Sequence, residues 1–209
     1  MIGIVDYKAG NLTSVGRALA YLEIPYVISG DPEVLKKCER IIFPGVGAAK
    51  SAMENLKAQG LDEFLKQAFA DGIPILGICL GMQIIMEYSE EDGGTETLGL
   101  IPGFVKRFPT PLVYGDEVLK VPHMGWNSVE WLREHPVFSG LEPDYEYYFV
   151  HSYFVQPKDE GIICGVTFYG INFPSAIAYK NLVAVQFHPE KSGNPGLKIL
   201  QNFSRWIPQ

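Results

Sequence analysis

A cysteine lies between two glycines at the end of an apolar run, in the segment Gly77-Ile78-Cys79-Leu80-Gly81. Residues 73–78 are apolar over a length that suits one buried strand, and Met82, Ile84 and Ile85 continue among polar neighbours, a pattern typical of a helix half-covered by core. Gly-x-Cys-x-Gly at such a junction is the cysteine form of a nucleophile elbow. A sharp strand-to-helix turn strains the nucleophile, and side chains two positions away on either side would collide with it.

The turn predicts a reactive sulfur at Cys79. It would place the thiol at the first turn of a helix, where the positive end of the helix favours thiolate over thiol. The alternative is a buried structural cysteine, which is the usual fate of a free cysteine.

A cysteine nucleophile needs a base and a group that orients the base. His188 follows the apolar run at 183–187 and so stands where a buried strand ends, as Cys79 does. Glu190 comes two residues later, beyond Pro189, and in an extended segment the side chains of His188 and Glu190 point to the same side. Glu190 would then hold the imidazole while its other nitrogen faces the sulfur. The alternative is a surface histidine and glutamate in a loop.

Three further histidines compete with His188. His123 is the second candidate for the base. His151 lies in an alternating, strand-like segment, which favours a hydrogen-bonded core histidine. His135 precedes Pro136 in a turn, where we expect a surface residue.

A glycine-rich loop, Pro44-Gly45-Val46-Gly47-Ala48, follows the third expected strand. If that strand neighbours the strand of Cys79, the backbone N–H groups of Gly45, Val46 and Gly47 can form an oxyanion hole together with the N–H of Leu80. The alternatives are a tight turn or a phosphate-binding loop. No Lys-Ser/Thr pair follows, as a phosphate loop would require.

Strands and helices alternate over the first ninety residues. We expect strands at 2–5, 25–28, 40–43 and 73–78, and helices at 12–22, 49–59 and 61–71. A further, short helix should begin at residues 31–32. Such alternation is typical of a parallel sheet covered on both faces.

The second half is mostly strand-like. We expect strands at 103–108, 117–121, 126–131, 145–155, 162–168 and 176–179, then a buried strand at 182–187 and a last helix at 195–206. The sequence thus predicts one α/β domain over residues 1–209, with an open, mostly parallel sheet, helices on both faces and an antiparallel extension.

Composition excludes several classes of protein. The 209 residues are 47% apolar and carry a net charge of −7 without a Lys/Arg cluster, which argues against nucleic acid or an anionic membrane as partner. The three cysteines are far apart and odd in number, no CxxC pair suggests zinc, and no secretory signal or membrane span is visible. We expect a cytoplasmic protein with no metal and no organic cofactor.

The motifs together resemble a known family. Pro44-Gly45-Val46-Gly47, Gly77-Ile78-Cys79-Leu80-Gly81-Met82-Gln83 and Phe187-His188-Pro189-Glu190 are similar to the motifs of the triad (class I) glutamine amidotransferases, in the same order. Further segments resemble the branch of that family that supplies ammonia to a (β/α)8-barrel cyclase in histidine biosynthesis. These segments are Asp6-Tyr7-x-x-Gly10-Asn11, Pro122-His123-Met124-Gly125-Trp126-Asn127, Tyr148-Phe149-Val150-His151-Ser152-Tyr153 and His188-Pro189-Glu190-Lys191-Ser192.

The resemblance implies a catalytic triad and a substrate. Cys79 would attack the side-chain amide of glutamine, His188 would transfer protons, and Glu190 would orient His188. Gln83 and the backbone around Gly47, Ser152 and Tyr153 would hold the substrate.

The resemblance also implies a heterodimer with the cyclase. Its contact residues here would be Asn11, Met124, Trp126 and Lys191. Three other classes stay open: a free-standing cysteine peptidase or γ-glutamyl hydrolase of the same architecture, a sister amidotransferase that serves another synthase, and a non-enzymatic regulatory subunit. The presence of all three triad residues disfavours the last of these.

Overall fold

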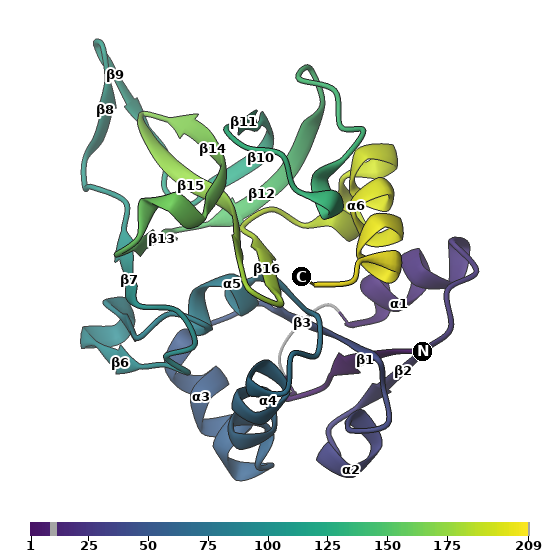
Figure 1. Cartoon of the computed structure of the whole chain (residues 1–209). Coiled ribbons are helices and arrows are strands. Elements are labelled where there is room, and N and C mark those ends of the chain that lie inside the picture. The colour runs from purple at the N-terminus through teal and green to yellow at the C-terminus, as the bar shows by residue number, and fades with distance from the viewer. Residues whose placement is uncertain (9–11, 209) are drawn as a thin grey trace.

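The computed structural model describes residues 1–8 and 12–208 (Figure 1). Asn11, expected to contact a partner, lies outside the described residues.

A mixed sheet forms the centre of the molecule. Five of its strands are parallel neighbours: β1 (Ile2–Val5), β2 (Tyr26–Ser29), β3 (Arg40–Gly45), β4 (Ile75–Cys79) and β16 (Leu182–Val185). Antiparallel strands extend it beyond β16: β15 (Ile171–Tyr179), β14 (Ile163–Tyr169) and β11 (Glu130–Trp131). The order is β11-β14-β15-β16-β4-β3-β1-β2. The expected fold class is confirmed.

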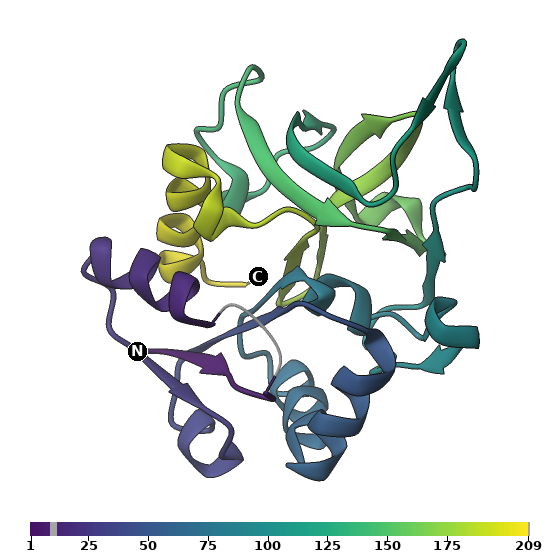
Figure 2. The same cartoon turned by 180° about the vertical axis from the view of Figure 1, so that it is seen from behind.

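Helices cover both faces of this sheet (Figures 1 and 2). On one face lie α1 (Leu12–Tyr21) and α6 (Gly193–Arg205), and on the other lie α2 (Pro32–Leu35), α3 (Ala49–Ala58) and α4 (Leu61–Ala70). The strands alternate between the two cores: Ile41 and Phe43 of β3 pack with α3 and α4, whereas Ile42 packs with α1 and α6. Because successive strand residues point to opposite faces, strands that are apolar throughout are buried on both sides.

Smaller sheets flank the antiparallel edge. Strand β10 (His123–Ser128) pairs with β12 (Glu146–His151), and β8 (Leu112–Tyr114) pairs with β9 (Glu117–Leu119). A third sheet has the order β13-β7-β5-β6, from β13 (Tyr153–Pro157), β7 (Gly103–Arg107), β5 (Tyr88–Ser89) and β6 (Thr95–Glu96). Short 3-10 turns are η1 (Glu91–Gly93), η2 (Pro136–Phe138), η3 (Glu160–Ile162) and η4 (Pro189–Lys191).

Three expectations about the elements were wrong. The strand expected at 126–131 is divided between β10 and β11, which belong to different sheets. The helix after the elbow, α5 (Leu80–Ile84), has five residues and all of them are buried, so it is not a half-covered helix. It is enclosed because α3, β13 and the strands β3, β4 and β16 surround it. The strand expected at 145–155 is two strands, β12 and β13, which separate at Ser152 and join different sheets.

Candidate active site

Cys79 occupies a strained turn between β4 and α5. It ends the strand and caps the helix with φ +54° and ψ −108°, a conformation that non-glycine residues rarely adopt. The elbow predicted from the sequence is therefore present. Backbone strain of this kind clusters at functional sites.

The two glycines of the elbow are required by neighbouring strands rather than by Cys79 itself, which corrects the expectation. A Cβ on Gly81 would collide with the carbonyl oxygen of Phe43 in β3. A Cβ on Gly77 would lie 3.1 Å from the Cβ of Ala184 in β16 and 3.2 Å from the carbonyl carbon of Gly81. The elbow is thus held tightly between β3 and β16.

His188 and Glu190 form a buried pair. His188 Nδ1 lies 2.7 Å from Glu190 Oε1, and the two side chains are 2% and 1% exposed. The segment is not extended as expected, because Pro189 begins the 3-10 turn η4. The turn still directs the carboxylate back onto the ring.

The surroundings of His188 favour its charged form. Burial lowers the pKa of His188, but the Cys79 sulfur and the Glu190 carboxylate outweigh burial and raise that pKa to about 10. His188 Nε2 is buried and makes no hydrogen bond of ordinary geometry, although the Cys79 sulfur is near enough to raise the pKa of the ring. The free nitrogen of the pair is therefore available to a substrate at Cys79.

A cavity of about 350 Å³ opens at the sulfur. It brings together Cys79 and six residues expected to bind substrate: Val46, Gly47, Leu80, Gln83, Ser152 and Tyr153. Gly45 lies beside it, since Gly45 pairs with Cys79 across β3 and β4. The expectation that the glycine-rich loop opens next to the elbow is confirmed.

Two polar residues of the site were missed in the sequence. Gln186 is fully buried; it donates to Cys79 Sγ at 3.7 Å and accepts from Gln83 Nε2 at 3.1 Å. A glutamine inside an apolar run, two residues before His188, was the available signal. Glu91 lines the cavity and accepts from the backbone N–H of Ala49 at 2.7 Å, and no local pattern points to it.

The remaining histidines have structural surroundings. His151 lines the cavity but is buried and hydrogen-bonded, as expected. His123, the second candidate for the base, is 2% exposed and bonds to His151 rather than to Cys79. His135 is not a plain surface residue: it is half-buried, and its ring accepts from the N–H of Val137 at 3.2 Å at the start of η2.

Three of the four residues expected to contact a partner lie on one face. Met124 and Trp126 of β10 are 62% and 55% exposed. Trp126 packs edge-on against Tyr148 with ring centroids 6.0 Å apart, and Lys191 Nζ lies 5.7 Å from the centroid of the same Tyr148 ring. We call Met124, Trp126, Tyr148 and Lys191 the Trp126 face.

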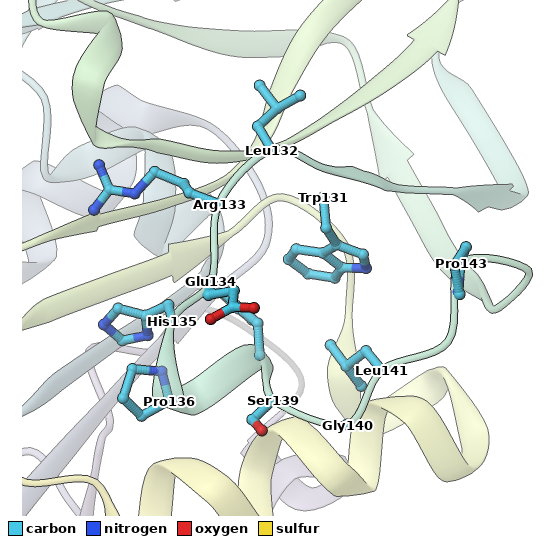
Figure 3. A pocket seen from close by; sticks show the side chains of 11 residues that line it. Trp131, Leu132, Arg133, Glu134, His135, Pro136, Ser139, Gly140, Leu141 and Pro143 are labelled. Atoms are coloured by element: carbon cyan, nitrogen blue, oxygen red, sulfur yellow. The ribbon is translucent and has the colours of Figure 1, made fainter.

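A larger cavity does not coincide with this chemistry. It measures about 830 Å³ and is lined by residues between Trp131 and Pro143 (Figure 3). None of Cys79, His188 and Glu190 borders it, so the smaller cavity is the candidate active site. Among the described residues, no group of three or more His, Cys, Asp or Glu side chains is arranged to hold a metal ion. No helix in residues 1–8 and 12–208 is long and apolar enough to cross a membrane.

Comparison with known proteins identifies the family. The sequence profile described as "Glutamine amidotransferase class-I" matches residues 4–206. The chain belongs to the class I glutamine amidotransferases. Solved structures with the same fold include a glutamine amidotransferase (TM-score 0.73, 18% identity, 97% of this chain and 98% of the other) and PurLQS from Thermotoga maritima (TM-score 0.71, 18% identity, 98% and 97%).

Closer relatives of this class I glutamine amidotransferase are known by sequence. "Imidazole glycerol phosphate synthase subunit HisH" of Sulfurimonas denitrificans is 50% identical over 206 residues, covering 99% of this chain and 98% of the relative. The protein of the same name from Maridesulfovibrio salexigens is 51% identical over 210 residues, covering 100% and 98%. The Geobacillus thermodenitrificans protein is 46% identical over 203 residues, covering 97% and 94%.

Proposed function

We propose that this chain is the glutaminase subunit of an imidazole glycerol phosphate synthase. It hydrolyses glutamine to glutamate and ammonia and passes the ammonia to a (β/α)8-barrel cyclase subunit in histidine biosynthesis. The observation that carries the glutaminase activity is the buried His188–Glu190 pair beside the strained Cys79. The names of the relatives that match along the whole chain support the pathway.

The reaction follows from the positions of these three side chains. Cys79 Sγ attacks the side-chain amide carbon of glutamine, and the carbonyl electrons move onto the oxygen. His188 protonates the amide nitrogen, so the C–N bond breaks and ammonia leaves a thioester on Cys79. His188 then takes a proton from water, which attacks the thioester, and the proton returns to sulfur as glutamate departs. Glu190 orients the ring and stabilises its cation.

The negative oxygen of both tetrahedral intermediates needs donors. Leu80 is the first residue of α5, and the first N–H groups of a helix have no acceptor within it. Val46 and Gly47 border the same cavity, and Gly47 has φ +98°. We assign the oxyanion to the backbone of Leu80 and of the Gly45–Gly47 loop.

The amino-acid end of glutamine requires charged and polar partners. Gln83, Ser152 and Tyr153 line the cavity, with the Glu91 carboxylate at the same wall. Among the described residues that line the cavity, Glu91 has the one acidic side chain, so we assign to it the substrate's α-ammonium group.

The Trp126 face suits the docking of the cyclase. Aromatic and methionine side chains are enriched at the centres of protein interfaces, and here they lie exposed beside a lysine. Lys191 directly follows Glu190, so a partner that contacts Lys191 touches the segment that holds the catalytic base.

The test uses the chain with its cyclase and the phosphoribulosyl precursor. We expect imidazole glycerol phosphate to form with glutamine as the nitrogen source. Cys79→Ala should abolish that synthesis while leaving synthesis from added ammonia intact, because only the glutaminase step needs the thiol. Gln201→Ala, in the second half of α6 and outside both the cavity lining and the Trp126 face, is a control expected to keep both activities. Undiminished glutamine-dependent synthesis by Cys79→Ala would refute the proposal.

A further inference from the structure

A second set of polar side chains, two buried and one half-buried, runs from β10 towards the cavity. Asn127 Nδ2 lies 3.3 Å from His123 Nε2, His123 Nδ1 lies 3.0 Å from His151 Nε2, and His151 Nδ1 lies 2.8 Å from the carbonyl oxygen of Tyr153. His123 and His151 are direct register partners in β10 and β12. Three side chains thus connect the strand of the Trp126 face to a residue that lines the active site.

The protons in this series of hydrogen bonds have one arrangement, which is fixed from both ends of the series. A carbonyl oxygen only accepts, so His151 Nδ1 carries a proton and its Nε2 accepts from His123 Nδ1. At the other end, the Asn127 amide is oriented by two backbone contacts: Nδ2 donates to the Phe168 carbonyl at 2.9 Å, and Oδ1 accepts from the N–H of Ser128 at 2.9 Å. Nδ2 therefore also donates to His123 Nε2, and the two ends require the same tautomers.

The series of hydrogen bonds continues from Tyr153 to the proposed nucleophile, Cys79. The Tyr153 carbonyl accepts a second hydrogen bond, from Gln83 Nε2 at 3.0 Å, and Gln83 Nε2 also donates to Gln186 Oε1 at 3.1 Å. Gln186 Nε2 then donates to Cys79 Sγ at 3.7 Å. One connected set of hydrogen bonds thus reaches the sulfur from Asn127.

Aromatic packing surrounds the two histidines. The His123 ring is stacked between Tyr169 and Phe149, with centroids 4.1 Å and 4.8 Å away, and His151 contacts Phe108 and Phe173. Burial lowers the pKa of His123 to about 4 and that of His151 to about 3. Both rings are therefore neutral near pH 7, and only neutral rings can donate through one nitrogen and accept through the other.

Strand β10 carries His123 and Asn127 on one side, and Met124 and Trp126 of the Trp126 face on the other. Burial alternates along it: His123 and Asn127 point inward, whereas Met124 and Trp126 are exposed. Because alternate side chains of a strand belong to one rigid backbone, a displacement of the exposed side moves the buried side with it.

We propose that His123, Asn127 and His151 form a positioning relay that fixes the Tyr153 edge of the glutamine cavity and links it to the Trp126 face. None of the three is a catalytic residue; each acts through the next. The proposal rests on the proposed function for its substrate and partner. Through the relay, a face without catalytic groups can alter the glutaminase site.

The test replaces His123 by residues that separate packing from hydrogen bonding. His123→Phe keeps a flat ring between Phe149 and Tyr169 but removes both hydrogen bonds. We expect kcat/KM for glutamine to fall about tenfold, since one or two buried hydrogen bonds are lost. His123→Asn places an amide where Nδ1 stood, can donate to His151, and should recover activity to within about threefold of the unmodified chain.

A second readout distinguishes positioning from general damage. A γ-electrophilic glutamine analogue reports on both the sulfur and the substrate cavity, whereas iodoacetamide reports on the sulfur alone. In His123→Phe, inactivation by the analogue should slow about tenfold and iodoacetamide labelling of Cys79 should change less than about twofold. Equal slowing of both would overturn the proposal, as would unchanged kinetics or a failure of His123→Asn to recover.

A control variant and a second relay variant accompany His123→Phe. His135→Phe changes the half-buried histidine that caps η2 and does not line the cavity at Cys79, so it should leave every rate unchanged. Asn127→Ser, at the half-buried outer end of the relay, takes the place of His123→Phe if that variant does not fold. It should slow glutamine turnover and inactivation by the analogue about threefold while iodoacetamide labelling stays nearly unchanged.

Stimulation of the glutaminase by the cyclase should fall in His123→Phe and in Asn127→Ser. Full stimulation would disprove the link to the Trp126 face. An unmodified chain without glutaminase activity would instead refute the proposed function.

Discussion

At the scale of single residues, Cys79 combines strain, position and access. Its positive φ stores strain that β3 and β16 hold in place, and its sulfur opens into the cavity. The other two cysteines are also buried, so burial alone does not separate the three. What separates them is the neighbouring His188 and the open cavity.

Selective alkylation tests this difference. We expect iodoacetamide to label Cys79 at least about tenfold faster than Cys38 or Cys164, because burial raises the pKa of both other thiols and neither borders the cavity. The measurement is peptide mapping after brief labelling of the folded chain. Labelling of all three at one rate would contradict it, and labelling in urea supplies the reference for equal access.

The roles of His188 and Glu190 predict unequal losses. His188→Ala removes both proton transfers, whereas Glu190→Gln keeps a hydrogen-bond acceptor near His188 Nδ1 and removes only the charge. We expect Glu190→Gln to retain at least about tenfold more kcat than His188→Ala. Glutaminase kinetics with the cyclase present measure this, and thermal unfolding checks that both variants fold. Equal losses would mean that Glu190 takes a direct part in proton transfer.

The sequence points to Cys79, His188 and Glu190 more directly than to the residues that contact them. Cys79, His188 and Glu190 are conspicuous because each interrupts or follows an apolar run with a chemically distinct side chain. Gln186 and Glu91 were missed because their roles depend on contacts with residues distant in the sequence: Gln186 with Cys79, and Glu91 with Ala49.

At the scale of elements, strand order assembles the site. β16, β4 and β3 are adjacent and parallel, so their carboxyl ends place His188, Cys79 and the Gly45–Gly47 loop side by side. Ligands of open α/β sheets bind at this edge. The alternation of strands and helices predicted the edge. The path of the antiparallel segments was not predictable in the same way, because β12 and β13 form one continuous strand-like stretch that only tertiary packing divides.

The buried histidines of β10 and β12 predict loss of stability in acid. Their pKa values lie near 4 and 3 in the folded chain, below the ordinary 6.5, so below pH 6.5 the unfolded state binds more protons. Their contribution is fully present above pH 6.5 and is lost as pH falls towards 4 and then 3. Each histidine should lower the free energy of unfolding by ~1.4 kcal/mol per pH unit in that window.

Urea unfolding between pH 7 and pH 5 measures the effect as a difference between variants. His123→Phe should lose stability less steeply with acid than the unmodified chain, since one of the three histidine rings with a lowered pKa (His123, His135 and His151) is gone. His188 does not add to this loss in acid, because its pKa is raised: its stabilisation is fully present below pH 6.5 and is lost as pH rises through about 10. Parallel pH dependences for the two chains would contradict the expectation.

At the scale of the whole molecule, the active site and the Trp126 face share one edge. His188 and Glu190 precede Lys191 without a break, and the N–H of His188 donates to the Tyr148 carbonyl at 2.9 Å. The cation that lies over Tyr148 is thus attached to the segment that carries His188, the proposed catalytic base. That residues 1–209 form one domain stays a prediction; we expect one cooperative transition in urea.

The last prediction concerns gating by the partner. Ammonia released without an acceptor wastes glutamine, so the lone chain should be a poor glutaminase that the cyclase and its ligand activate. Activation requires that the partner stabilise an active state preferentially. Lys191 is suited to report it, because a carboxylate of the cyclase can pair with the exposed ammonium in a desolvated contact. Lys191→Ala should lower stimulation by about tenfold, and more than it lowers the basal rate.

Lys180→Ala is the matched control for that measurement. Lys180 also lies over aromatic rings, 5.1 Å from the Tyr179 centroid and 5.8 Å from that of Phe69, but it precedes β16 at the opposite end of the sheet. Removing this cation costs the same kind of contact without touching the Trp126 face, so stimulation should be unchanged. A high glutaminase rate from the lone chain, unaltered by the cyclase and its ligand, would show that the partner does not gate the site and that Lys191 has no part in activation.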